Sequence, residues 1–356
     1  MTAPELSINP VKGRSLLQGY LGITSTVSFR GTIDFTTPRQ LNVRSLTLAL
    51  DGFYRTTLTI GKKQHEEKLN FLYRSSILID STVPLYTDRV DQKHNVVVLP
   101  PGKHSIPFSI DIPEDVCKDL PASFFTEPVE NEDSATVRYE LTATLNVLPA
   151  AWMSTPFDGK VKTQSCMELV DVARIQSDIL LDQSTSQTLL KNEDSTMDYK
   201  ILVSNIKFGA EKPILLTIEE LVVHYCHVLK DIEVAIKQHE VLRCSGHQKT
   251  YTPSIAVPAK TLKYKKTWHA GSYIVKNVEC TLALPADAKA QKKFKTVPHQ
   301  ALDSPLLTVF HVLEVKVRLN DGREVKIEAP VIFSEASRQA QKMVERAEGN
   351  LVEFQE

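Results

Sequence analysis

The chain has 356 residues, more than a single hydrophobic core usually serves, so its length predicts two domains. Its 42 basic and 43 acidic residues leave a formal net charge of −1, which excludes the strong positive field of a dedicated nucleic-acid binder. No segment reaches the roughly 20 apolar residues of a membrane-spanning helix, and the start, MTAPELSINP, lacks the basic and apolar regions of a signal peptide.

Alternation of apolar and polar residues predicts β-strands along most of the chain. In residues 104–113, HSIPFSIDIP, the apolar side chains fall on one face, and in residues 137–147, VRYELTATLNV, every odd position is apolar. Residues 231–237, 309–319 and 324–333 repeat the pattern. A period of two is typical of a strand with one face in a core and one in water, so we expect many half-buried strands.

The connections favour antiparallel pairing of these strands. Asp321 and Gly322 separate the last two predicted strands, and an Asp-Gly pair favours a hairpin because glycine tolerates positive φ. Short strands, turn-rich connections and almost no helical periodicity together predict an all-β protein built of antiparallel β-sandwiches.

The strand pattern weakens between residues 150 and 196, and we place the domain boundary near residue 175. The predicted domains are residues 1–175 and residues 176–333. One segment, SEASRQAQKMVERAEG, has helical spacing of its apolar residues, with Ser334 as N-cap and Gly349 as the residue that ends the helix. We therefore expect a short C-terminal helix and an extended tail over residues 334–356.

The five cysteines are far apart and never form a CxxC pair. Their odd number and wide spacing favour reduced, buried thiols in a cytosolic protein over a disulfide or zinc framework. They are Cys117, Cys166, Cys226, Cys244 and Cys280.

Several stretches resemble the arrestin superfamily. Residues 96–124, followed after an acidic insert by residues 137–145, are similar to the second half of an arrestin N-domain. Residues 29–56 resemble the opening strands of that domain, and residues 303–319 with 329–333 resemble the closing strands of an arrestin C-domain. The resemblance covers nearly the whole chain and is closest to fungal alpha-arrestins.

The resemblance implies two immunoglobulin-like β-sandwiches in tandem, joined by a short linker. It also implies a cytoplasmic adaptor without catalysis or cofactor, located peripherally at the plasma membrane or endosomes. Such adaptors link the tails of membrane-protein cargo, transporters or receptors, to endocytosis and to a WW-domain ubiquitin ligase. A retromer-like endosomal sorting subunit is the alternative within the same fold.

Alpha-arrestins usually recruit their ligase through Pro-Pro-x-Tyr peptides, whose extended backbone is set by proline. The sequence holds no such peptide, because its only Pro-Pro pair precedes Gly102 and Lys103. A relaxed variant remains at Val83, Pro84 and Tyr86 in STVPLYTD. This segment is either a WW-domain ligand or a loop whose tyrosine packs on its own domain.

Receptor-binding arrestins also hold a buried charged network that phosphate releases. Residues 169–176, LVDVARIQ, are similar to the strand that carries the arginine of that network. However, Arg174 lies one position away from the expected place, where Ala173 stands. The phosphate switch is therefore not expected here.

Two lysine-rich segments, KTLKYKKTWH and AKAQKKFKTVPH, interleave basic with aromatic residues. Each is either a solvated face or a site for anionic lipid or inositol-phosphate headgroups, to which each lysine near a membrane would add about 1 kcal/mol. The candidate residues are Lys260, Lys263, Lys265, Lys266, Lys292, Lys293 and Lys295.

Signals for catalysis or metal binding are weak. Residues 224–227, HYCH, form the densest His/Cys cluster, but neighbouring residues of a strand face opposite ways, so three ligands would not converge. The sequence contains no GxSxG, phosphate-binding glycine loop or HExxH motif. An enzyme or small-ligand binder on the same sandwiches is the third alternative, and it would require a deep polar pocket.

The last six residues, LVEFQE, are similar to the clathrin-binding peptide in the tails of non-visual arrestins. Three apolar side chains would fill pockets of the clathrin propeller, and acidic side chains would meet basic residues beside them. The alternative is that the apolar residues fold back on the last helix or sandwich. The candidate residues are Leu351, Val352, Glu353, Phe354 and Glu356.

Overall fold

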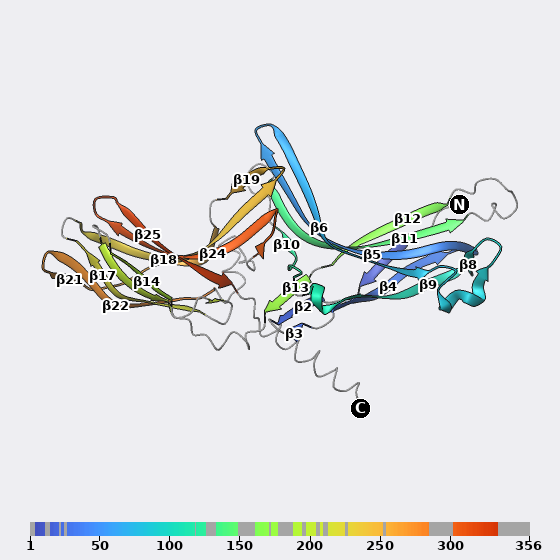
Figure 1. Ribbon diagram of the computed structural model, residues 1–356, viewed down its shortest axis with the longest axis horizontal. Coiled ribbons are helices and arrows are strands. Elements are labelled where there is room, and N and C mark those ends of the chain that lie inside the picture. The colour runs from blue at the N-terminus through green and yellow to red at the C-terminus, as the bar shows by residue number, and fades with distance from the viewer. Residues whose placement is uncertain are drawn as a thin grey trace, which may run out of the picture. The chain divides into compact units, whose positions relative to one another are not determined.

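β-Strands, almost all of them paired antiparallel, make up most of the described part of the computed structural model (Figure 1), which confirms the all-β prediction and is consistent with the arrestin fold. The chain divides into two units, Met1–Arg174 and Ile175–Glu356, and each is described by itself. The structure describes residues 4–10, 15–20, 23–24, 27–117, 119–125, 133–148, 161–170, 172–176, 188–193, 197–203, 207–208, 213–224, 227–251, 254–284 and 302–333.

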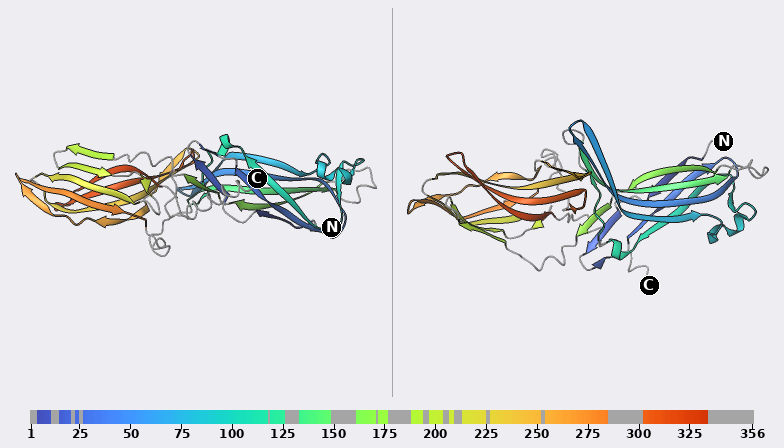
Figure 2. Two further views of the ribbon diagram at one scale, coloured as in Figure 1. Left: turned by 90° about the horizontal axis from the view of Figure 1, so that it is seen from below. Right: turned by 45° about the horizontal axis from the view of Figure 1, so that its top comes forward.

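The first unit is a sandwich of two main sheets (Figure 2). One sheet has the order β1-β4-β9, and the other has the order β10-β11-β5-β8-β7 with β12 added to β11 and β6 added to β5. A small third sheet has the order β13-β2-β3. The elements are β1 (Leu6–Pro10), β2 (Ser15–Tyr20), β3 (Ile23–Thr24), β4 (Val27–Thr37), β5 (Leu41–Ile60), β6 (Lys63–Ile79), the 3₁₀ helix η1 (Pro84–Arg89), β7 (Val90–Asp91), β8 (Val96–Leu99), β9 (Gly102–Ile112), α1 (Glu114–Cys117), β10 (Phe124–Phe125), β11 (Ser134–Leu148), β12 (Lys162–Val170) and β13 (Val172–Gln176).

The predicted alternation matches the burial in this unit. All four apolar residues of β9 that were placed on one face, from Ile106 to Ile112, are buried, as is every odd position of β11 from Val137 to Val147. They pack with inward-facing residues such as Ile33 of β4 and Leu48 of β5. Burial of this apolar surface, at roughly 25 cal/mol per Å², is the main stabilising term of the sandwich.

A bulge in the β5–β6 hairpin fixes the packing around one buried tyrosine. The register shifts between Gly52 and Phe53, so that Phe71 of β6 has no partner of its own on β5. The Phe71 ring lies so close to Gly52 that an added Cβ there would be 2.5 Å from it. Phe71 in turn contacts the ring of Tyr139 edge-on, with centroids 5.5 Å apart. Gly52 therefore leaves the space that lets Phe71 support Tyr139.

The second unit also has two sheets, with the orders β14-β15-β17-β22-β21 and β16-β25-β24-β18-β19; β20 pairs with β18 and β23 with β24. Its core is formed by aliphatic residues of both sheets, among them Ile218, Val234 and Leu313. The strands are β14 (Thr188–Glu193), β15 (Met197–Val203), β16 (Lys207–Phe208), β17 (Ile214–Val223), β18 (Leu229–Cys244), β19 (His247–Thr250), β20 (Ser254–Thr261), β21 (Lys266–His269), β22 (Ser272–Leu282), β23 (Leu302–Asp303), β24 (Leu307–Leu319) and β25 (Glu324–Phe333).

The predicted hairpin at Asp321 and Gly322 joins β24 to β25. The two strands pair antiparallel, from Arg318 opposite Glu324 to His311 opposite Val331. Gly322 has a φ of 85°, the left-handed conformation that glycine adopts at little cost. No helix within the described ranges is long and apolar enough to cross a bilayer. The C-terminal helix and tail predicted over residues 334–356 lie outside the described residues.

Candidate functional site

The lysine-rich segment 260–269 lies in the second unit, where it runs from the end of β20 through residues 262–265 into β21. Two of its members, Leu262 and Tyr264, are held against the sandwich. Leu262 is buried, and its backbone N–H donates to the carbonyl of Ile232 over 2.8 Å. The Tyr264 hydroxyl donates to the carbonyl of Lys230 over 3.2 Å, and burial, helped by the charge of Asp231, raises the pKa of Tyr264. These two residues fix the segment to the sandwich.

The lysines around these two anchors are exposed. Lys263 and Lys265 point to solvent because Leu262 and Tyr264 alternate with them. Lys260 donates to the carbonyl of Thr281 over 2.5 Å, and Lys266 donates to the carbonyl of Leu229 over 3.2 Å. None of the four lysines forms an ion pair with a carboxylate in the described part of the chain, so their charge is uncompensated there.

Two aromatic residues extend this surface along the β21–β22 hairpin. Trp268 is opposite Tyr273 in the register, and their rings meet edge-on with centroids 4.7 Å apart. The Lys266 ammonium lies 5.1 Å from the Tyr273 centroid, within cation–π range. Trp268 remains 56% exposed. An exposed indole beside lysines combines an apolar ring with a polar N–H, as interfacial tryptophans do.

Tyr273 was not among the residues predicted from the sequence. The turn that brings it next to Trp268 is formed by Ala270 and Gly271, which both have positive φ, at 49° and 82°. Two such residues favour a tight hairpin whose twist matches that of the flanking strands. The glycine between KTWH and SYIV is the sequence signal that would have predicted this pairing.

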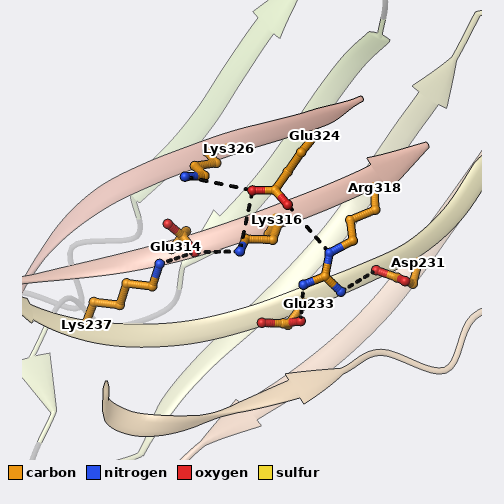
Figure 3. A network of polar contacts seen from close by, with 8 residues as sticks. All are labelled: Asp231, Glu233, Lys237, Glu314, Lys316, Arg318, Glu324 and Lys326. Carbon is orange, nitrogen blue, oxygen red and sulfur yellow. Dashed lines mark hydrogen bonds and ion pairs between the residues drawn. The ribbon is translucent and has the colours of Figure 1, made fainter. Parts of the chain in front are cut away.

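On a second charged surface of the same unit, the acidic and basic side chains form ion pairs with one another (Figure 3). Arg318 pairs with Asp231, Glu233 and Glu324 over 3.2, 2.7 and 3.6 Å. Glu314 pairs with Lys237 over 2.7 Å. Four acidic and four basic residues of β18, β24 and β25 thus neutralise one another, which leaves little net field for an external ligand. They are Asp231, Glu233, Glu314, Glu324, Lys237, Lys316, Arg318 and Lys326.

The other predicted basic residues, Lys292, Lys293 and Lys295, lie outside the described residues. So does the whole clathrin-like peptide 351–356. Arg174 lies in β13, but its side chain is not described. The structure therefore brings together only Lys260, Lys263, Lys265 and Lys266 from the predicted lipid site.

The relaxed WW-ligand segment is folded into its own domain. Pro84 begins the 3₁₀ helix η1, and the Tyr86 N–H donates to the carbonyl of Val83 over 3.0 Å. The Tyr86 side chain is only 6% exposed, and burial raises its pKa. A WW domain takes an extended peptide with an accessible tyrosine, so this geometry favours the alternative of a packed loop tyrosine.

The histidines of residues 224–227 have separate partners. His224 Nε2 lies 3.5 Å from Asp198, whereas His227 Nδ1 accepts a hydrogen bond from Arg323 over 2.8 Å. Within the described residues, no group of three or more His, Cys, Asp or Glu side chains is arranged to hold a metal ion. Cys226 lies outside those residues.

Residues 26–169 match the family model described as Arrestin (or S-antigen), N-terminal domain. The matched residues extend from just before β4 to the end of β12, which is most of the first unit. The match supports the arrestin superfamily, while the closer likeness to fungal alpha-arrestins stays a prediction. No curated protein matches the chain.

Proposed function

From the arrestin N-terminal domain match over residues 26–169, we propose that the chain is a non-catalytic adaptor in membrane-protein trafficking. In this role it acts in the cytoplasm and docks peripherally at the plasma membrane or endosomes. It connects the tails of transporters or receptors to endocytosis. Fold alone does not fix function, so the proposal needs a surface that would hold the adaptor at a membrane.

The observation that carries membrane docking is the uncompensated lysine segment beside Trp268. Four lysines within seven residues have no described carboxylate partner, and their chain is held in place by Leu262 and Tyr264. Each lysine near an anionic leaflet adds about 1 kcal/mol, so four would contribute about 4 kcal/mol. An exposed indole would add interfacial burial. The surface therefore suits anionic lipid, including phosphoinositide headgroups.

Co-sedimentation with vesicles tests this docking. We expect binding to phosphatidylcholine vesicles that contain phosphatidylserine or a phosphoinositide, and little binding to phosphatidylcholine alone. Charge reversal of Lys263, Lys265 and Lys266 to glutamate should abolish the difference. The control variant combines Lys62→Glu with Lys103→Glu, two exposed lysines of the first unit whose charge is reversed in the same way. It should bind these vesicles nearly as well as the parent chain. Binding that ignores anionic lipid, or survives the triple reversal, would remove this docking surface from the proposal.

The ligase and clathrin connections are separate parts of the adaptor proposal. Clathrin binding rests on residues 351–356, and the test is a pull-down on the clathrin terminal domain with Leu351→Ala and Phe354→Ala combined. Ligase recruitment has weaker support, because Tyr86 is buried in η1. If Tyr86→Ala abolishes ligase capture while thermal unfolding is unchanged, the segment is a ligand despite its packing.

Affinity purification with identification of the partners tests the adaptor role as a whole. Recovery of transporters or receptors together with clathrin or a WW-domain ligase is the expected result. Recovery of retromer components instead would assign the chain to an endosomal sorting scaffold. Recovery of neither class would contradict both roles.

A further inference from the structure

One edge of β11 in the first unit carries two strands placed end to end. β10 pairs through Phe124 with Val137 and through Phe125 with Thr136. β12 pairs with the same edge from Tyr139 onward. Arg138 therefore lies opposite the junction between the two strands. A surface pocket of about 250 Å³, here called the junction pocket, opens at this point.

Two half-exposed apolar side chains wall the junction pocket. Phe125 is opposite Thr136, and Leu169 is opposite Glu140, so both face outward on the same side of the sheet as Arg138. Phe125 is 49% exposed and Leu169 is 50% exposed. An apolar group bound between them would cover surface that is now in contact with water, which is favourable.

The floor of the pocket is fixed by hydrogen bonds. The buried Tyr139 hydroxyl donates to the carbonyl of Pro121 over 2.6 Å. Ser123 donates its backbone N–H to the carbonyl of Val172 over 2.7 Å, and its hydroxyl accepts from the Val172 N–H over 2.9 Å. These bonds join the segments before β10 and after β12. The site is therefore preorganised, which lowers the entropy lost on binding.

The charge around the pocket is uneven. The Arg138 guanidinium lies 5.8 Å from the Phe125 ring centroid. On the next strand, Phe53 is opposite Arg138, and the Lys68 ammonium lies 3.7 Å from the Phe53 centroid. Neither cation forms an ion pair with a carboxylate of the described chain.

The row of residues on the other side of Arg138 is acidic. Glu140 of β11 is opposite Asp51 of β5, and it is also opposite Leu169 of β12. A bound acidic group would be repelled from that row and attracted toward Arg138 and Lys68. The pocket thus offers an apolar position with a positive side and a negative side.

We propose that the junction pocket binds an extended peptide in which one large apolar side chain has acidic residues on one side only, the side that faces Arg138 and Lys68. The pocket volume lies below the roughly 300–1,000 Å³ of typical small-molecule sites and suits a single anchor side chain. In the described part of the chain, β12 forms strand hydrogen bonds only with β11, and β1 lies close to it. Arg138 selects for a carboxylate next to the anchor.

The proposal rests on the adaptor function only for the source of the peptide, a cargo or accessory-protein tail. Synthetic peptides therefore test it without reference to trafficking. Failure here leaves the adaptor proposal in place, and failure of the partner purification leaves this binding measurable.

The test is fluorescence anisotropy of the full chain with three labelled peptides. We expect saturable binding of GSEELSSGS, and binding at least about tenfold weaker for GSEESSSGS, which lacks the anchor, and for GSKKLSSGS, which reverses the charge. Arg138→Gln and Leu169→Ser should each weaken binding of GSEELSSGS by about tenfold or more. Phe125→Ser replaces Leu169→Ser if the latter variant fails to fold.

Matched controls use exposed residues of β6. Ile77→Ser removes a similarly exposed apolar side chain, and Arg74→Gln removes an exposed cation of β6, so both should bind GSEELSSGS as the parent chain does. Equal binding of all three peptides, or binding that survives Arg138→Gln and Leu169→Ser, would overturn the proposal. Self-association in sedimentation velocity that Leu169→Ser abolishes would assign the pocket to a second copy of the chain, and would overturn it as well.

Discussion

Lys237→Met removes the closest cation from the buried carboxylate of Glu314. The Glu314 side chain is 5% exposed, and its Oε1 lies 2.7 Å from Lys237 Nζ and 3.9 Å from Lys316 Nζ. After the substitution only Lys316 remains, at the limit of ion-pair distance. A nearly buried charge with so weak a partner is costly, because it has lost water without a full replacement.

The magnitude follows from the exposure of the two partners. Breaking a fully buried pair costs about 3–5 kcal/mol, but Lys237 is 22% exposed, so part of its interaction is already screened. We expect Lys237→Met to lower the free energy of unfolding of the second unit by about 2–3 kcal/mol. Adding Glu314→Leu replaces the pair by apolar groups and should return stability to within about 1 kcal/mol of the parent chain.

Hydrogen exchange of the backbone amides of β18 and β24 measures this effect locally, because a chain of two units need not unfold in one step. The control is Lys326→Met. The Lys326 side chain is 52% exposed and its ammonium lies 3.8 Å from Glu324, so a change within about 0.5 kcal/mol is expected. Unchanged protection in Lys237→Met, or a double variant less stable than the single one, would refute the reasoning.

Three further predictions concern single side chains. Tyr139→Phe removes the donor to the buried carbonyl of Pro121 and should lower the free energy of unfolding of the first unit by about 1–2 kcal/mol in urea titrations; an unchanged midpoint would contradict the role of that bond. Burial raises the pKa of Glu240 in the folded state, because the charged carboxylate is disfavoured there. The folded protein therefore loses stability as the pH rises from the ordinary glutamate pKa through the folded pKa. Glu240→Gln should therefore raise the thermal midpoint at pH 7, and the gain should vanish below about pH 4, under the ordinary glutamate pKa; the opposite trend would be evidence against burial as the cause. Cys166 is the least buried of the described cysteines, so iodoacetamide should label it before Cys117, Cys244 and Cys280. Burial also raises the pKa of Cys166, and because the thiolate is the reactive form, labelling should be faster at pH 9 than at pH 7. Peptide mass spectrometry measures both the order and the rate, and labelling of the buried cysteines first would contradict the prediction.

The sequence predicted the parts of the fold that depend on local periodicity. The inward face of β11 from Val137 to Val147 follows from its alternation, and the β24–β25 hairpin follows from Gly322. Such features need only the period of a strand and the φ of one turn residue. They are fixed before any long-range pairing is known.

The alternation did not predict which charges would be compensated. It placed Glu314 and Lys316 on one face of β24, opposite the core. Whether Glu314 would be exposed or nearly buried depends on Lys237, which is 77 positions earlier and reaches it only through the β18–β24 register. The junction pocket has the same origin, since Phe125 and Leu169 become neighbours only because β10 and β12 share β11.

The candidate lipid site was predicted in part. The lysines of residues 260–266 are visible in the sequence, and their exposure follows once Leu262 and Tyr264 are inside. The burial of Tyr86 was one of two alternatives, because a Val-Pro-x-Tyr segment does not by itself indicate whether its tyrosine packs on its own domain. Tertiary packing decided between them.

The long antiparallel pairing of β5 with β11 has a consequence during synthesis. Asn42 of β5 pairs with Leu148 of β11, and Thr57 pairs with Ser134, so the two strands meet only after the intervening chain has been made. Roughly 90 residues separate the end of β5 from the end of β11, which takes a ribosome about 5–20 s at ~5–20 residues per second. For that time the growing β5–β6 hairpin presents an unpaired hydrophobic edge, and such edges are templates for aggregation. During that interval the nascent first unit therefore exposes a strand edge that favours aggregation.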